Sequence, residues 1–104
     1  MRITLRQLDV FSAVAREGSV TKAAQWLSLT QSATSMALAD LEAQLNAKVF
    51  DRLGRRLQLN ELGRRLLPLA QETVARAQEI EDIASGSSPG HGRLRIGASL
   101  TIGN

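Results

Sequence analysis

The chain has 104 residues, of which 43% are apolar, enough for one small domain with a modest core. It contains no Cys and a single His, which excludes a disulfide framework and a zinc site built from Cys or clustered His ligands. The formal net charge is +3 and is unevenly distributed, because residues 1–65 carry a net +4 and residues 66–104 a net −1. The first part of the chain is therefore the candidate polyanion-binding part.

No stretch of the sequence approaches the roughly 20 consecutive apolar residues that a membrane span requires. The N-terminal residues also lack a basic start followed by a long apolar run, which is the pattern of a secretory signal. We therefore expect a soluble, cytoplasmic protein with no membrane partner.

Residues 4–17 are predicted to form the first helix. Its apolar face carries Leu8, Phe11, Val14 and Ala15. Gly18 is a plausible helix terminator and Ser19 an N-cap, so a second helix is expected at once, over about residues 20–27. The small Ala23 and Ala24 allow another helix to approach closely. Trp26 is interpreted as a packing anchor rather than a residue that stacks on bases.

A third helix is predicted to begin at Thr30 or Gln31, after a short turn, and to end at Asn46. At 3.6 residues per turn its two sides differ in character. The core side consists of Thr34, Ala37, Leu38, Leu41 and Leu45. The opposite side consists of Ser32, Ser35, Met36, Ala39 and Ala43. Solvated helix faces usually carry charged residues, so this small, hydroxylated and nearly uncharged side favours close contact with a large, flat partner.

Residues 49–59 are predicted to form a β-hairpin that turns at Leu53-Gly54. Its alternation assigns Phe50, Leu57 and Leu59 to the core. The residues expected in solvent are Arg52, Arg55, Arg56 and Gln58, which give the hairpin an arginine-rich tip. The alternative interpretation is an ordinary solvated turn, since Arg is common on protein surfaces.

Residues 61–84 predict one long helix with apolar positions spaced alternately by four and three. This seam comprises Leu62, Leu66, Leu69, Thr73, Arg76, Ile80 and Ile83. The spacing lets one helix lie along another. Pro68 is expected to kink the helix near residues 60–65 or to end a first short segment, and Arg76 is a second imperfection. A short, flawed seam favours a pairing that other contacts support.

Residues 85–92 are rich in Gly, Ser and Pro and predict a flexible hinge, in which the lone His91 is interpreted as solvated. Residues 93–104 alternate apolar and polar side chains, which predicts a β-strand. Because one terminal strand has no evident partner, we expect it to be the first strand of a second domain that the chain does not contain.

The order helix, helix, turn, helix, basic hairpin predicts a mainly α protein with a winged helix-turn-helix fold, over residues 1–60, followed by the long helix of residues 61–84. The start of the third helix, at Thr30, offers free N–H groups to phosphates, and its small residues permit close approach to base edges. Arg52, Arg55 and Arg56 supply attraction that does not depend on DNA sequence. The alternative is a dimerisation or protein-interaction module whose basic surface is incidental.

An enzyme is not expected from this inventory of side chains. The sequence offers no Ser, His and Asp arrangement to argue from, and it has no Gly-rich phosphate loop of the GxxxxGK type. The acidic residues Glu79, Glu81 and Asp82 are interpreted as the wet face of the long helix. No cofactor is expected either.

The region from about residue 3 to residue 84 resembles the N-terminal DNA-binding domain of LysR-type transcriptional regulators of bacteria. The resemblance is carried by Phe11, Gly18-Ser19, Ala23-Ala24, Gln31-Ser32, Ser35, Leu41-Glu42, Phe50-Asp51-Arg52 and Leu62-Gly63. The tail GRLRIGAS looks like the first strand of the family's effector-binding domain.

This resemblance implies a homodimer that pairs through the long helix, is assembled further into a tetramer and binds a partly palindromic double-stranded promoter site. It also implies a small-molecule co-inducer that acts through the missing C-terminal domain. The family's DNA contacts fall on Thr21, Gln31, Ser32, Ser35, Met36, Arg55 and Arg56. Together with Thr30, Ala39 and Arg52, these are the predicted DNA-binding residues. The predicted dimerisation residues are Leu62, Leu66, Leu69, Thr73, Ile80 and Ile83.

Two positions depart from the pattern of the family. Ser32 stands where Pro is common, and Met36-Ala37 stand where an Arg, often followed by Gln, is common. The third helix is therefore expected to read DNA through hydroxyl hydrogen bonds and apolar contacts, with Gln31 the best candidate for an adenine. Asn60 replaces the usual Thr before the long helix, where Asn caps equally well.

Overall fold

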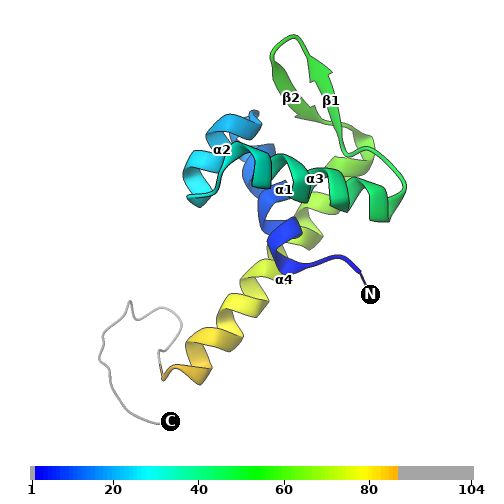
Figure 1. Cartoon of the computed structure of the whole chain (residues 1–104). Coiled ribbons are helices and arrows are strands. Elements are labelled where there is room, and N and C mark those ends of the chain that lie inside the picture. The colour runs from blue at the N-terminus through cyan, green and yellow to red at the C-terminus, as the bar shows by residue number, and fades with distance from the viewer. Residues whose placement is uncertain (1, 87–104) are drawn as a thin grey trace. The chain divides into compact units, whose positions relative to one another are not determined.

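A computed structural model describes residues 2–86 of the chain. The chain divides into two compact units, Met1–Glu72 and Thr73–Asn104. The elements are α1 (Leu5–Glu17), α2 (Val20–Leu27), α3 (Gln31–Leu45), β1 (Phe50–Leu53), β2 (Arg56–Leu59) and α4 (Glu61–Ala84) (Figure 1). The mainly α winged helix-turn-helix fold predicted from the sequence is confirmed.

Side-chain and backbone caps define the ends of α1 and α2. Thr4 forms a capping box with Gln7 and so satisfies backbone N–H groups at the start of α1. Gly18 ends α1 with φ 71°, a left-handed conformation that glycine adopts without steric cost. The hydroxyl of Ser19 accepts a hydrogen bond from the Lys22 N–H at 3.2 Å, which starts α2 directly after α1. The predicted corner between these helices is confirmed.

The third helix also begins and ends as predicted. The Thr30 hydroxyl accepts a hydrogen bond from the N–H of Ala33 at 3.0 Å, and Asn46 ends the helix in the left-handed conformation. Ser28 adopts the same conformation in the short turn between α2 and α3, with φ 59°. The turn therefore fixes where α3 starts relative to α2.

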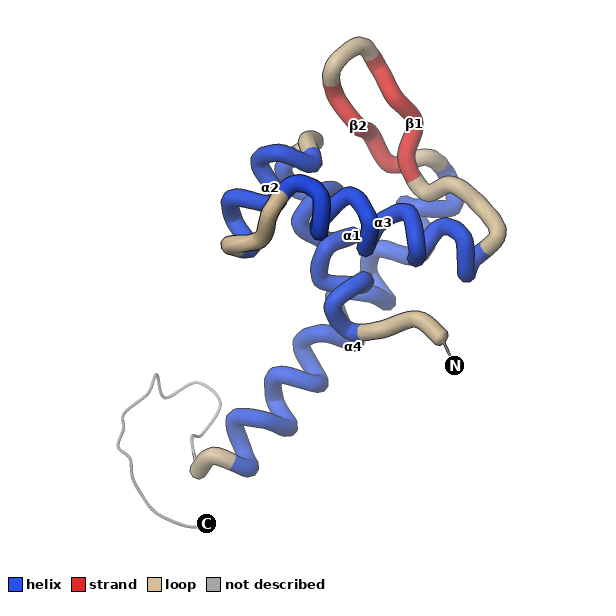
Figure 2. The backbone as a smooth tube through the Cα atoms, in the orientation of Figure 1, coloured by secondary structure: helices blue, strands red, loops and turns tan. Residues whose placement is uncertain are grey.

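The hairpin forms a two-stranded antiparallel sheet, which we call the wing (Figure 2). Phe50 pairs with Leu59, and Leu53 pairs with Arg56. The turn therefore consists of Gly54 and Arg55, and the predicted turn at Leu53-Gly54 is wrong by one residue. The positive φ of Gly54, 62°, suits the first central position of a two-residue hairpin loop.

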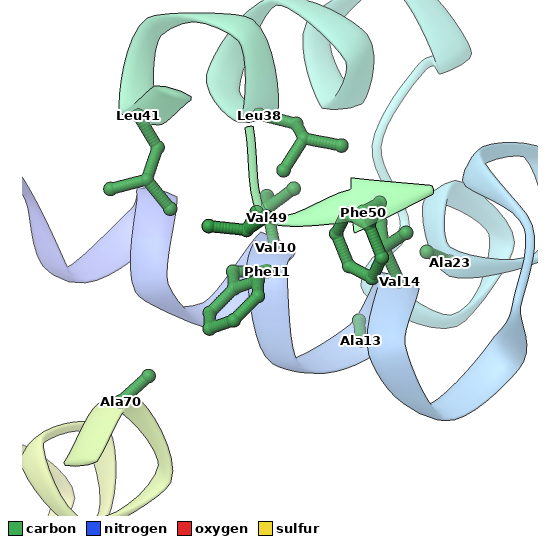
Figure 3. Close-up of a cluster of buried hydrophobic side chains, with 10 residues drawn as sticks. All are labelled: Val10, Phe11, Ala13, Val14, Ala23, Leu38, Leu41, Val49, Phe50 and Ala70. Carbon is green, nitrogen blue, oxygen red and sulfur yellow. The ribbon is translucent and has the colours of Figure 1, made fainter. Parts of the chain in front are cut away.

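One hydrophobic core occupies the first unit and includes side chains from all four helices and the wing. Figure 3 shows its buried members, which are Val10, Phe11, Ala13, Val14, Ala23, Leu38, Leu41, Val49, Phe50 and Ala70. The rings of Phe11 and Phe50 meet edge to face at 5.6 Å between centroids, an arrangement worth about 1 kcal/mol beyond area burial. These contacts hold the start of the wing against α1.

The buried face of α1 includes Phe11 and Val14, as predicted, but it is shifted toward Gln7, Val10 and Ala13. Val10 and Ala13 are fully buried, whereas Leu8 and Ala15 are only half-buried. This face includes the buried Gln7, whose side-chain oxygen accepts a hydrogen bond from the Thr4 N–H and so closes the capping box. Because Gln7 is polar, it interrupts the apolar pattern from which the buried face was predicted.

Trp26 is not a packing anchor, contrary to the prediction, because its side chain is 65% exposed. Val20, Ala23, Ala24 and Leu27 form the inward arc of α2, and Trp26 lies roughly 110° from the centre of that arc at 3.6 residues per turn. The guanidinium of Arg16 instead covers its ring, at 4.5 Å from the centroid.

The fourth helix is continuous from Glu61 to Ala84, with Pro68 inside it. The prediction that the proline ends a first short segment is therefore wrong. The part of α4 within the first unit packs on the core through Leu62, Leu66, Leu67 and Ala70. Residues 73–84 continue the helix in the second unit, and Ser85 and Gly86 follow as a turn. From residue 87 on, the predicted hinge and the strand of residues 93–104 lie outside the described residues.

Candidate nucleic-acid interface

The outer face of α3 is exposed and free of charge along most of its length. Ser32, Ser35, Met36 and Ala39 are all exposed, and the Met36 side chain is 64% exposed. The inner face is held by Thr34, Leu38 and Leu41, which are buried. Thr34 also donates its hydroxyl hydrogen to the Thr30 carbonyl at 2.9 Å. The structure thus presents four small or apolar side chains on a rigidly seated helix.

The N-terminal turn of α3 adds hydrogen-bond donors to this face. Gln31 and Ser32 are exposed there, and the first N–H groups of a helix have no partner within the helix. The Thr30 side chain accepts a hydrogen bond from the N–H of Ala33, and the N–H groups of Gln31 and Ser32 have no partner within the helix. Such a helix end attracts phosphate through both its donors and its dipole.

A second helix N-terminus carries the predicted Thr21. Ser19 caps α2, Thr21 is exposed in the first turn, and the exposed Lys22 follows it. Sequence reasoning missed Lys22, although a cation in the first turn of a helix is unfavourable for the helix dipole and so indicates another role. Thr21 and Lys22 together offer a hydroxyl and a positive charge to an anionic partner.

The three arginines of the wing are exposed but do not lie together. Arg52 lies on β1 and lines a groove beside α3, whereas Arg55 lies in the turn. Arg56 lines a different pocket with Ala15 of α1 and Arg64 of α4. The three arginines therefore do not form the single arginine-rich tip that the sequence predicted. Arg55 is at the turn, and Arg52 and Arg56 lie on opposite faces of the sheet.

The groove between α3 and the wing has a volume of about 460 Å³. Its lining residues are Val20, Ser35, Leu38, Ala39, Glu42, Lys48, Phe50, Asp51, Arg52 and Leu57. It brings the predicted Ser35, Ala39 and Arg52 together and adds Lys48, whose side chain is 80% exposed. Sequence reasoning missed Lys48, because its position between α3 and the wing has no periodicity to reveal it.

A set of hydrogen bonds fastens α3, the wing and α4 to one another. The Glu42 carboxylate accepts a hydrogen bond from the N–H of Val49 at 2.9 Å and lies 3.7 Å from the Lys48 ammonium. The Asn60 side chain donates to the Lys48 carbonyl and accepts from the Gly63 N–H, both at 2.8 Å. Asn60 is therefore both the cap of α4 and a link to the start of the wing.

The residues of the predicted seam of α4 fall into a half-buried group and an exposed group. Leu62 and Leu66 are half-buried against the core of the first unit. Leu69, Ile80 and Ile83 are exposed, by 59%, 69% and 65%, and Thr73 is exposed as well. The first two seam residues thus pack within the chain, whereas the seam residues from Leu69 onward are exposed.

The part of the chain that the structure describes contains neither a cluster of metal ligands nor a membrane-spanning helix. Between residues 2 and 86, no three His, Asp or Glu side chains lie close enough to hold a metal ion. Within the same residues, no helix has the length and apolar character needed to cross a membrane.

Comparison with known proteins identifies relatives of the whole chain. It is 51% identical over 104 residues to the HTH-type transcriptional regulator YeiE of Escherichia coli (strain K12), matching all of this chain and 34% of the relative. It is 37% identical over 103 residues to the RuBisCO operon transcriptional regulator of Allochromatium vinosum, matching 98% of this chain and 34% of the relative. The chain therefore spans about a third of the length of these relatives.

Solved structures share the fold. An H2O2-bound mutant of Corynebacterium glutamicum OxyR matches 83% of this chain and 27% of its own, with a TM-score of 0.79 and 34% identity. The DNA-binding domain of CbnR, solved as a DNA complex, matches 80% of this chain and 95% of its own, with a TM-score of 0.72 and 29% identity. The model of the lysR family of bacterial regulatory helix-turn-helix proteins matches residues 5–64. The chain belongs to the LysR family.

Proposed function

We propose that this chain is the DNA-binding part of a sequence-specific transcription regulator that acts on promoter DNA in the cytoplasm. The observation that carries the proposal is the capped α3, whose exposed and uncharged outer face lies beside a groove lined by Arg52 and Lys48. Such a helix can enter a major groove while the flanking cations meet phosphates. The solved DNA complex of the CbnR DNA-binding domain supports this assignment.

In this proposal the outer face of α3 reads bases. Ser32 and Ser35 donate or accept hydrogen bonds at base edges, and Met36 and Ala39 make apolar contacts such as those to thymine methyl groups. Gln31 is the candidate for a bidentate contact to adenine. Thr21 and Thr30 lie at helix starts suited to phosphates.

The wing and the groove supply attraction that is independent of sequence. Arg52 and Arg55 are exposed cations, and Lys48 lies at the rim of the groove. Each phosphate that such a cation neutralises releases counterions, so affinity depends steeply on salt concentration. Specificity is thereby assigned to α3 and most of the binding energy to the cations around it.

We further propose that the protein is a homodimer paired through α4, with a tetramer in the full-length regulator. Ile80 and Ile83 are large apolar side chains exposed on α4, which supports pairing with a second copy. The proposed domains are residues 1–60 for DNA binding, 61–84 for pairing, 85–92 as a hinge and 93–104 as the start of an effector-binding domain. A co-inducer would act only through that further domain.

Selection of bound sites from a random duplex library tests this function. We expect a recovered motif with two half-sites about one helical turn apart or a multiple of that. Affinity for the recovered site should fall steeply as salt rises from about 50 to 200 mM. Recovery of no motif, together with no duplex binding at low salt, would leave the chain as a protein-interaction module with an incidental basic surface.

Variants of α3 test which residues read sequence. Ser35→Ala and Met36→Ala should each change the preferred base at one position of the motif, because a contact to a base edge is worth about 1–3 kcal/mol of discrimination. Gln71→Ala, at an exposed position of α4, is the control and should leave the motif unchanged. If both α3 variants recover the original motif, another element reads the DNA.

A further inference from the structure

The wing is joined to the corner between α1 and α2 through one glycine. The N–H of Leu57 donates a hydrogen bond to the Gly18 carbonyl at 3.0 Å. The Gly18 N–H in turn donates to the Val14 carbonyl at 2.8 Å and so ends α1. Because Leu57 lies in β2, this contact places the second strand of the wing directly at the end of α1.

The side chain of Arg56 lies over the same glycine. A Cβ atom added to Gly18 would lie 3.2 Å from Arg56 Nη2, 3.5 Å from Nε and 3.7 Å from Cζ. The guanidinium therefore occupies the space that a side chain at residue 18 would need. This location is also the C-terminal end of α1, where the helix dipole favours a cation. Arg56 thus has both a steric and an electrostatic reason to remain at the corner.

Arg55 has a different environment, although it is the next residue. It lies in the two-residue turn of the hairpin and is exposed. Among residues 2–86, neither Arg55 nor Arg56 makes a side-chain hydrogen bond or ion pair, so the two arginines differ in that only the Arg56 guanidinium lies over Gly18. The Arg55 guanidinium is therefore available to an anionic partner, and its position depends on how β2 is held.

We propose that Arg56 is a positioning residue that anchors the wing to Gly18 and thereby holds Arg55 at the DNA, rather than a second phosphate contact. The inference rests on the proposed DNA-binding function and deepens it. Arg55 and Arg56, which the sequence groups as equivalent cations, have separate roles. Arg55 meets the phosphate, and Arg56 keeps the strand that carries it in place.

Salt titration of duplex binding by single and double variants tests this division. Arg55→Ala should reduce the slope of log affinity against log salt by about one, the loss of one phosphate contact. Arg56→Ala should also reduce the slope, by up to the same amount, because Arg56 acts through the position of Arg55. The double variant should then match Arg55→Ala, with a total loss of about one rather than two. An additive loss of about two would overturn the proposal.

Arg52 supplies the control for this experiment. It is an exposed wing arginine that lines the groove beside α3. It pairs with Leu57, but it does not line the pocket that Arg56 lines. Arg52→Ala combined with Arg55→Ala should give additive losses, since each arginine meets its own phosphate.

A second measurement does not depend on DNA. Hydrogen exchange of the Leu57 amide, followed by NMR, reports whether β2 remains hydrogen-bonded to Gly18. Exchange should become about tenfold faster in Arg56→Ala and stay unchanged in Arg55→Ala. Equal exchange in both variants would overturn the anchoring role. If the unaltered protein binds no duplex, the proposed function fails, while this exchange experiment still decides the role of Arg56.

Discussion

Single residues join α3, the wing and α4, and Gly63 is the one with the least conformational freedom. A Cβ atom at this position would collide with the carbonyl oxygen of Val49 and would lie 2.8 Å from Leu59 Cδ2. Val49 O also accepts the N–H of Asn60 at 3.1 Å, so the obstacle is fixed backbone rather than a flexible side chain. The lack of a side chain at Gly63 lets α4 start directly against the wing.

Gly63→Ala should therefore destabilise the fold by about 2–4 kcal/mol, because α4 or the start of the wing must move. The measurement is the free energy of unfolding from urea denaturation. Gly54→Ala is the control, since a Cβ there meets nothing within 4 Å and only its positive φ is strained. It should cost about 1 kcal/mol. Equal losses in the two variants would contradict a collision at Gly63.

At the scale of single residues, the sequence predicted helix ends correctly where the capping interaction involves neighbouring residues. The Ser19 cap and the end of the first helix at Gly18 were confirmed, because each acts on backbone groups within a few residues. The separation of Arg55 from Arg56 could not be predicted. It depends on the Leu57 hydrogen bond to Gly18, which joins residues far apart in the sequence.

At the scale of elements, periodicity predicted which segments are helices more reliably than which way they face. The bounds of α2 and the two sides of α3 agree with the prediction. The orientation of Trp26 does not, because two small alanines and the flanking Val20 and Leu27 occupy the inward arc. The prediction placed Trp26 in the core because its side chain is large and apolar. The residues of α2 that are buried are instead the small Ala23 and Ala24.

Within α4, Pro68 tests how a helix tolerates an internal proline. Proline removes one backbone hydrogen bond, and its ring crowds the carbonyl of Arg64 one turn earlier. The helix is nevertheless continuous over Glu61–Ala84, since Leu66, Leu67 and Ala70 pack it on the core. Packing thus outweighs the local preference of the proline.

Replacing Pro68 by Ala should raise the free energy of unfolding by about 1–3 kcal/mol and leave the fold unchanged. Alanine restores the missing N–H donor and removes the ring. Urea denaturation and far-ultraviolet circular dichroism measure the effect, and Gln71→Ala, exposed on the same helix, should change stability by less than about 0.5 kcal/mol. A stability equal to or lower than that of the unaltered chain would show that the ring itself contributes to packing.

For the whole molecule, the charge distribution and the exposed apolar residues assign different tasks to different parts of the chain. Residues 1–65 carry a net +4, and the cations Arg52, Lys48 and Lys22 lie around the outer face of α3 or at a helix start. Residues 66–104 carry a net −1 and include the exposed Ile80 and Ile83. Polyanion binding is thus favoured in the first part and self-association in the second.

Self-association through α4 makes a prediction for the assembled protein. Ile80 and Ile83 are 69% and 65% exposed within a single chain, so replacing both by Ser should hardly change the folding of the monomer. Burial of each side chain in a dimer is worth about 1.5–3 kcal/mol, so the double variant should raise the dissociation constant at least tenfold. Sedimentation equilibrium measures the change.

Glu81→Gln is the control, at an exposed position between the two isoleucines in the sequence, and it should preserve the dimer. Unchanged association of the double variant would exclude this face of α4 from the dimer contact.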